Sequence, residues 1–440
     1  MAFQLCALII SVLIISLLIL KGLHPILSVI IGCSLMIWTN GLPYAATFTS
    51  GLESWGAAMM PTIFVTLLGA AFGVLYTKCG AIDSLARFLM KPSGLMKSAN
   101  GKIVMCILGL VAFRVVLGIA GFANEAIIVT MLAVSGVIFR TADVDRRHLP
   151  ALTAFAASVG TCLPGAPTMI NVFLQLNLPG YSATAYFIPR LILWILFVVL
   201  FCLFMTIWLA RDRRKGAHFE PGNMILPELA DGAKLPPVWL CFIPILVVIV
   251  IYSVVGLDAW ISIGIGVIAA ILCLWKYYPV DENSKTRFGS VLEYCGQGVM
   301  LIPIQLMLMV LPTMILTQSP AFTWGVEALA ESGLPMVVSL AIIVLIMMFF
   351  AGLGGVPAIC PTFLNVFMPS GISMYTFAAL VTWGVAFSGG LPTNASITVE
   401  SNLADCSVKK TYPSIFIGSI CTAVILYILA ILTGLMGVWG

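Results

Sequence analysis

The feature that most constrains this chain is a succession of apolar runs, many of them long enough to cross a lipid bilayer. A spanning helix needs about 20 mostly apolar residues. Of the 440 residues, 61% are hydrophobic and only 9% are charged, against roughly a quarter charged in soluble domains. A soluble fold of this size would expose apolar patches that promote aggregation. The composition therefore predicts an all-α integral membrane protein with many spans.

The apolar runs form two halves with the same order of elements. In the first half, residues 1–210, the runs are 3–20, 24–39, 57–77, 103–139, 149–178 and 186–210. In the second half, residues 237–440, they are 237–256, 259–275, 292–316, 335–368, 374–404 and 411–436. Residues 211–236 are charged and rich in Pro and Gly, which predicts a cytoplasmic linker. A basic amphipathic stretch at 78–102 and a polar connector at 317–334 occupy matching places.

Two runs in each half contain helix breakers. Run 103–139 carries Gly118 and Gly121 near its middle, and run 335–368 is broken at Gly352–Pro357. Both predict re-entrant hairpins of two short arms, because non-helical backbone is tolerated at membrane depth only where protein or a cavity surrounds it. Runs 149–178 and 374–404 are interrupted by Leu163-Pro164 and Leu391-Pro392. Proline removes an amide donor, so each of these runs predicts a discontinuous helix.

The charges orient this arrangement. With 78–102 placed in the cytoplasm, Arg114 and Arg190 are the only two of the 21 basic residues that do not lie on the cytoplasmic side, which leaves 19 there. The predicted external loops carry only acids: Glu53, Asp258, Glu327 and Glu331. Such a split is what the positive-inside rule requires. It predicts two inverted repeats, each with five transmembrane helices and one hairpin, and both termini outside.

Several functional classes are disfavoured by the sequence. The net charge of +4 is too small to predict nucleic-acid binding. The twelve cysteines are scattered and form no CxxC pair, so they are interpreted as small buried hydrophobes rather than a metal or disulfide framework. No HExxH, GxSxG or phosphate-binding loop is present, so neither an enzyme nor an ATP-driven pump is predicted, and no cofactor is expected. Residues 3–20 lack a basic flank and a cleavage site, which favours a retained helix over a signal peptide.

Three segments resemble the gluconate permease family of the ion transporter superfamily: Gly51–Leu89, Gly160–Asn171 and Gly390–Thr398. The resemblance implies a proton-coupled transporter of small hydroxy acids or sugar acids in a bacterial inner membrane, often as a homodimer. Relatives carry a histidine beside the second proline break, where this chain has Thr393. None of its histidines, His24, His148 and His218, falls in a predicted pore.

The candidate substrate site lies where the helices break. Half-helix ends offer free N–H groups and positive N-termini to a carboxylate, and unwound carbonyls to a cation. The polar candidates of the first half are Asn124, Thr161, Thr168 and Asn171. Those of the second half are Thr393, Asn394, Ser396 and Thr398, with Gly354 and Gly355 allowing a ligand to approach the backbone. The alternative is interhelical hydrogen bonding, worth about 0.6 kcal/mol per bond, and it is favoured for any single Ser or Thr. For Asn171 and Asn394, beside the matched breaks, we favour binding. We expect them to share one cavity with Asn124.

Arg114 and Glu125 are the charges placed deepest. Ionisable groups inside a membrane are expensive and usually functional, but these two could simply neutralise each other. If they do not, Arg114 is the predicted carboxylate anchor and Glu125 the predicted proton carrier. Glu400 is a second proton candidate, for which a solvated position near a helix end is favoured. Arg190 is expected to anchor a helix end at the membrane surface.

The expected function is therefore a symporter that works by alternating access. The sequence leaves a sodium-coupled transporter or a channel open as alternatives, and it does not identify the carboxylate.

The predicted topology can be tested by labelling. Single cysteines at positions 91, 146, 213 and 285 of a cysteine-free variant should react with an impermeant maleimide only from the cytoplasmic side. Cysteines at positions 53 and 331 should react from outside and serve as controls. External labelling at 146 or 213 would contradict the inverted arrangement.

Overall fold

The computed structural model describes most of the chain: residues 1–21, 23–90, 98–119, 135–136, 139–140, 142–220, 222, 235–280, 284, 286–300, 311–391, 394, 397, 400–402 and 404–440. Helices and short turns make up all the secondary structure in these ranges, so the all-helical prediction is confirmed for them. The inverted relation between the halves stays a prediction.

The first half contains eight described α-helices. They are α1 (Ala2–Leu20), α2 (Pro25–Thr39), α3 (Tyr44–Lys78), α4 (Ala81–Met90), α5 (Ala99–Ile119), α7 (Leu149–Thr161), α8 (Met169–Asn177) and α9 (Phe187–Arg214). A 3-10 turn, η2 (Arg146–His148), leads into α7.

The second half is more segmented. Its described α-helices are α10 (Val238–Ile249), α11 (Ala259–Cys273), α12 (Arg287–Met300), α14 (Leu311–Thr317), α15 (Pro320–Ala330), α16 (Met336–Ala351), α17 (Gly355–Thr362), α18 (Met374–Gly389), α20 (Val408–Ile415) and α21 (Cys421–Leu435). Short 3-10 or π turns extend or join them: η3 (Val250–Val255), η4 (Trp275–Tyr277), η5 (Gly352–Gly354), η6 (Phe363–Phe367) and η7 (Phe416–Ile420).

Two predicted boundaries are wrong. The span expected at 57–77 is part of α3, a helix of 35 residues that starts at Tyr44. Helix α14 packs on its N-terminal half, where the side chain of Ile315 lies over Gly51, so packing stabilises helix where the polar sequence predicted a loop. The connector 317–334 holds α15, which Ser319 caps by accepting a hydrogen bond from the Ala321 amide.

The first arm of the predicted 103–139 hairpin corresponds to helix α5. Helix α5 has 21 residues and ends at Ile119, between the predicted breakers Gly118 and Gly121. The predicted tip, with Asn124 and Glu125, lies outside the described residues. In the 335–368 hairpin the predicted break is present: α16 ends at Ala351, and Gly352 has φ +54°, a value that favours glycine.

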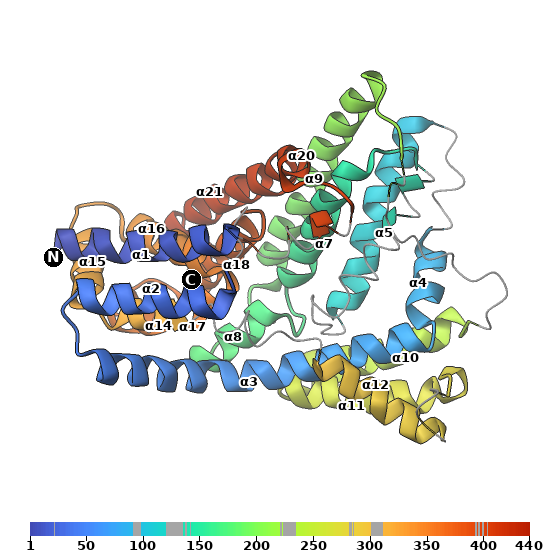
Figure 1. The fold of residues 1–440 in the computed structure, drawn as a ribbon, viewed down its shortest axis with the longest axis horizontal. Coiled ribbons are helices and arrows are strands. Elements are labelled where there is room, and N and C mark those ends of the chain that lie inside the picture. Colours follow the sequence, from blue (N-terminus) through green and yellow to red (C-terminus); the bar gives the residue numbers. More distant parts are fainter. Residues whose placement is uncertain are drawn as a thin grey trace.

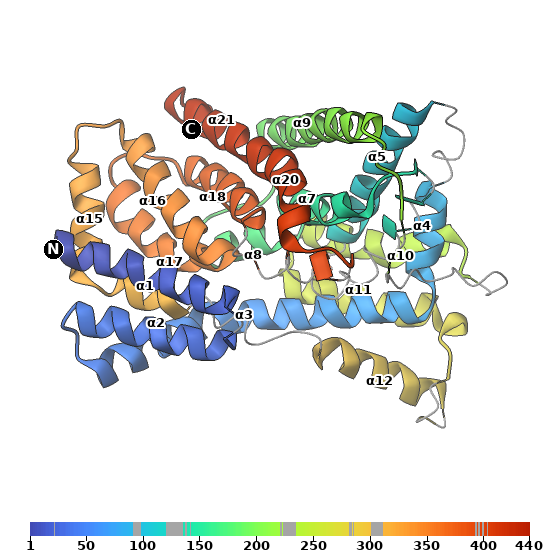
Figure 2. The same cartoon turned by 45° about the horizontal axis from the view of Figure 1, so that its top comes forward.

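Helix α3 organises the arrangement of the bundle. It packs against α2 and α14 at one end and against α11 and α12 at the other, so it runs along much of the molecule (Figure 1). Helices α7, α18, α20 and α21 meet between these two groups, and α9 packs on α5 and α21 (Figure 2).

Four helical stretches of the described chain are long and apolar enough to cross a membrane: Asn100–Gly118, Phe187–Arg214, Val238–Val255 and Val408–Leu435. Helix α9 shows why a bilayer suits them. Its buried face includes Phe197, Phe201 and Met205, while Val199, Leu203 and Ile207 on the other face are about half exposed. A helix that is apolar on every face requires an apolar surrounding on every face, which lipid supplies.

Candidate functional site

The break between α7 and α8 is present where the two prolines predicted it. Helix α7 ends at Thr161, and residues 162–168 form a turn that contains Gly165 at φ +72°. Thr168 caps α8, its hydroxyl oxygen lying 3.5 Å from the Asn171 amide nitrogen. Thr161 instead donates to the Ala157 carbonyl of its own helix.

The side chain of Asn171 closes this turn. It is 1% exposed, and its Nδ2 donates to the carbonyls of Leu163 (3.2 Å) and Ala166 (2.9 Å). Its Oδ1 accepts from the Tyr181 hydroxyl (3.0 Å) and from Arg190 Nη2 (2.7 Å). Two donors and two acceptor positions exhaust the capacity of an amide. In this conformation Asn171 holds the break, and its role toward a substrate stays a prediction.

Arg190 binds acceptors inside the protein. Its second bond runs from Nη1 to the Ala183 carbonyl (2.7 Å), and its guanidinium lies 5.9 Å from the centre of the Tyr181 ring. The non-helical backbone after α8 exposes the Ala183 carbonyl, and Arg190 donates a hydrogen bond to it within the protein. The expected anchoring of a helix end at the membrane surface by Arg190 stays a prediction.

The second break begins after α18. Helix α18 ends at Gly389, and Asn394 Nδ2 donates to the Gly389 carbonyl (3.2 Å). Thr393, Ser396 and Thr398, like Asn124 and Glu125, lie outside the described residues.

Gly354 and Gly355 of the second hairpin lie at the start of α17, and Gly355 packs against the backbone of α16. Gly354 caps α17, which begins at Gly355. A Cβ atom on Gly355 would lie 2.9 Å from the Met347 carbonyl oxygen. The absence of a side chain at Gly355 therefore permits close packing of the hairpin on itself, and its approach to a ligand stays a prediction.

The two interrupted helices lie side by side. The Cys162 thiol at the end of α7 donates to the Thr382 carbonyl of α18 (3.5 Å). A Cβ atom on Gly389 would lie 3.1 Å from Ser158 Oγ. The breaks of the two halves therefore lie near each other inside the protein, as the expectation of a shared site requires. The shared cavity of Asn171, Asn394 and Asn124 stays a prediction.

A buried ionic centre lies on the same helix, α7. Thr153 Oγ1 donates to Glu400 Oε2 at 2.8 Å, and Glu400 is 1% exposed. Arg114 of α5 is 3% exposed, interacts electrostatically with Glu400 and lies against Gly160, where a Cβ atom would be 3.0 Å from its Nε. The solvated position expected for Glu400 is therefore wrong. Whether Arg114 also pairs with Glu125 stays open.

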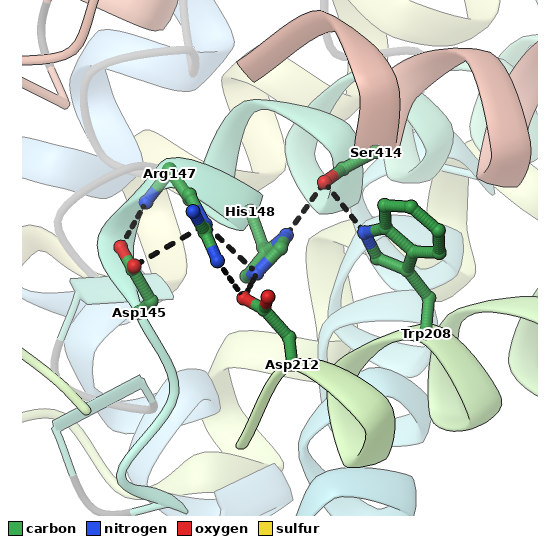
Figure 3. A network of polar contacts seen from close by, with 6 residues as sticks. All are labelled: Asp145, Arg147, His148, Trp208, Asp212 and Ser414. Atoms are coloured by element: carbon green, nitrogen blue, oxygen red, sulfur yellow. Dashed lines mark hydrogen bonds and ion pairs between the residues drawn. The ribbon is translucent and has the colours of Figure 1, made fainter. Parts of the chain in front are cut away.

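A second polar cluster ties the start of α7 to α9 and α20 (Figure 3). His148 is 2% exposed. Its Nε2 lies 2.7 Å from Asp212 Oδ2, and its Nδ1 lies 2.5 Å from Ser414 Oγ. Trp208 Nε1 donates to the same Ser414 oxygen at 3.2 Å. Sequence reasoning missed this cluster, because Ser414 is 266 positions from His148 and no local pattern joins them.

Arg147 completes the cluster at its solvent side. Its guanidinium pairs with Asp212 and lies 3.2 Å from Asp145 Oδ2, while its backbone amide donates to Asp145 Oδ1 at 3.0 Å. Burial of the ring lowers the pKa of His148 despite the attraction of Asp212, so the neutral ring is favoured. Within the described part of the chain, no group of three His, Cys, Asp or Glu side chains is placed to hold a metal ion.

Comparisons with known proteins leave the family open. No family model matches the chain, and no curated protein matches it. Among solved structures, one similar chain is the YdaH transporter of Alcanivorax borkumensis, a structure described as having an unusual topology. It is 15% identical, the match covers 89% of this chain and 88% of that one, and the TM-score is 0.48. A likeness this distant assigns neither a family nor a function.

The role of Asn171 in the break predicts a stability effect. Asn171→Ala leaves two carbonyls, a hydroxyl and a guanidinium N–H without their partner. Each buried polar group without a hydrogen bond lowers the stability by about 1–3 kcal/mol. We expect a clear fall in the melting temperature of the purified protein. Asn177→Ala is the control, since Asn177 donates only to the Phe173 carbonyl of its own helix. An unchanged melting temperature for Asn171→Ala would contradict this structural role and favour a role of Asn171 in substrate binding.

The buried His148 predicts a pH dependence. Because its folded-state pKa lies below the ordinary value of 6.5, the unfolded chain takes up a proton first as the pH falls through 6.5. The contribution of His148 to stability is therefore present above pH 6.5 and decreases below it. Between pH 7.5 and 5.5, the melting temperature of the wild type should fall more than that of His148→Gln. His24→Gln, at an exposed histidine, should retain the wild-type slope. Equal slopes for wild type and His148→Gln would refute the assignment.

Proposed function

We propose that this chain is a secondary active transporter that carries a small carboxylate together with protons. The observation that carries the proposal is the pair of interrupted helices, α7–α8 and α18 with its following segment, in contact inside a bundle of membrane-length apolar helices. Interrupted helices that meet within a membrane bundle are a hallmark of transporter binding sites.

The local chemistry favours an anionic substrate. Helix α8 begins at the break, so its first N–H groups and its positive end are directed toward it. Arg114 supplies a buried guanidinium on the neighbouring α5, and a planar guanidinium matches a carboxylate. The resemblance of Gly160–Asn171 and Gly390–Thr398 to the gluconate permease family narrows the proposed class to sugar acids and hydroxy acids. On the same resemblance we propose that the protein lies in a bacterial inner membrane and forms a homodimer.

Protons are favoured over sodium as the coupling ion. Sodium would need several oxygen ligands at the breaks. The carbonyls of Leu163 and Ala166, the natural candidates, already accept from Asn171. A buried carboxyl group with a hydroxyl partner is present at Glu400 and Thr153, and such a group can bind a proton.

The proposal predicts a ligand and a driving force. In a thermal-shift screen, D-gluconate at 100 times its dissociation constant should stabilise the purified protein by about 2.7 kcal/mol. Proteoliposomes should accumulate labelled D-gluconate under an inward proton gradient and not under a sodium gradient alone. Protein-free liposomes and a protonophore are the controls.

Three outcomes would revise the proposal. Accumulation that needs sodium and ignores pH would reject proton coupling while retaining carboxylate transport. Flux at millions of ions per second through single molecules would favour a channel. A screen of sugar acids and hydroxy acids with neither stabilisation nor uptake would reject the substrate class.

A further inference from the structure

The position of Glu400 follows from a buried helix face and from a contact of its segment with α20. Ile397, Ser401 and Ala404 follow the spacing of one helix face around it, and all four residues are buried. Ser401 Oγ lies 3.0 Å from Thr411 Oγ1, which fixes this segment to the start of α20. The carboxyl group is therefore directed into the protein against α7 rather than toward solvent.

Among the described residues, two side chains act on the Glu400 carboxyl group. Thr153 of α7 donates a hydrogen bond to the carboxyl group, and the charged Arg114 of α5 acts on it electrostatically. On α20, the uncharged Thr411 bonds to the segment of Glu400 through Ser401. Burial opposes the charged form of a carboxylate. The hydrogen bond from Thr153 and the positive charge of Arg114 oppose this effect of burial.

The hydroxyl of Thr153 can serve both states of the carboxyl group. Thr153 Oγ1 lies 2.8 Å from Glu400 Oε2, 3.2 Å from the Leu149 carbonyl and 3.1 Å from the Pro150 carbonyl. It has one proton to donate and two lone pairs that accept. With ionised Glu400, that proton points to Oε2. With protonated Glu400, the carboxyl O–H donates to Thr153 Oγ1, and the threonine proton turns to Leu149 or Pro150.

We propose that Glu400 is the proton-binding group of the transport cycle and that its proton is taken up when a substrate carboxylate occupies Arg114. This proposal rests on the function proposed above. In the empty site the charges of Arg114 and ionised Glu400 cancel. A substrate carboxylate on Arg114 adds a second anion, and one proton from water bonds to Oε2 of Glu400. The loaded site is again neutral, so one monocarboxylate and one proton cross together without net charge.

The test combines transport with a direct observation of the proton. In proteoliposomes, Glu400→Gln should lose accumulation of D-gluconate under a proton gradient, down to the level of protein-free vesicles. It should keep exchange of labelled for unlabelled D-gluconate at equal pH, since exchange needs no net proton movement. Glu331→Gln, at an exposed carboxyl group at the end of α15, should behave as wild type. Uptake by the wild type should not depend on membrane voltage. Retained accumulation in Glu400→Gln, or voltage-driven uptake by the wild type, would overturn the proposal.

Infrared difference spectra between two pH values test proton binding at Glu400 independently of substrate transport. The wild type should show the C=O band of a protonated carboxyl group, and Glu400→Gln should lack it. Thr153→Val, which removes the donor to the ionised form, should move the midpoint of this band to higher pH. Both measurements need no substrate, so they decide the proton site even if D-gluconate is not carried. A band that persists in Glu400→Gln, or a midpoint unchanged by Thr153→Val, would refute the role of Glu400.

Discussion

The site region depends on the satisfaction of backbone groups that a broken helix leaves unpaired. Between α7 and α8 the chain gives up its helical hydrogen bonds in a place where water cannot replace them. The Asn171 amide, positioned by Tyr181 and Arg190, takes the carbonyls of Leu163 and Ala166. Because this network keeps the end of α7 in place, it also sets the contact of α7 with α18 and the position of Thr153.

The same helix connects two polar centres of different character. One centre consists of Thr153 and Glu400, joined by a hydrogen bond, and the buried Arg114, which acts on Glu400 electrostatically. At the start of α7, His148, Asp212 and Ser414 join elements from both halves of the sequence, and Arg147 keeps one side of the cluster in contact with solvent. An α7 displaced along its axis would break bonds in both centres, so the two are mechanically linked.

The sequence predicted what depends on local pattern. The apolar runs, the prolines around Gly165 and the glycine at position 352 place helices and breaks where the structure has them. The helix at Pro320–Ala330 carried a readable signal, Ser319 followed by proline, that the polar composition obscured. Burial of Glu400 was also readable, from the spacing of Ile397, Ser401 and Ala404 on one face. By contrast, the bonds of Asn171 and the pairing of His148 with Ser414 join residues 5 to 266 positions apart. Such bonds arise from tertiary packing, and periodicity and composition carry no information about them.

The length of α3 has a mechanical consequence. At 1.5 Å per residue its 35 residues extend about 52 Å, well beyond a hydrocarbon core of about 30 Å. It must therefore either protrude from the bilayer or lie strongly tilted in it. Since it packs on α14 at one end and on α11 and α12 at the other, it behaves as a lever. A rotation of about 5° about one end moves the other end by roughly 4–5 Å, given its helical rise. One stiff element can thus convert a slight rocking of one helix group into a displacement of atomic-contact size in the other.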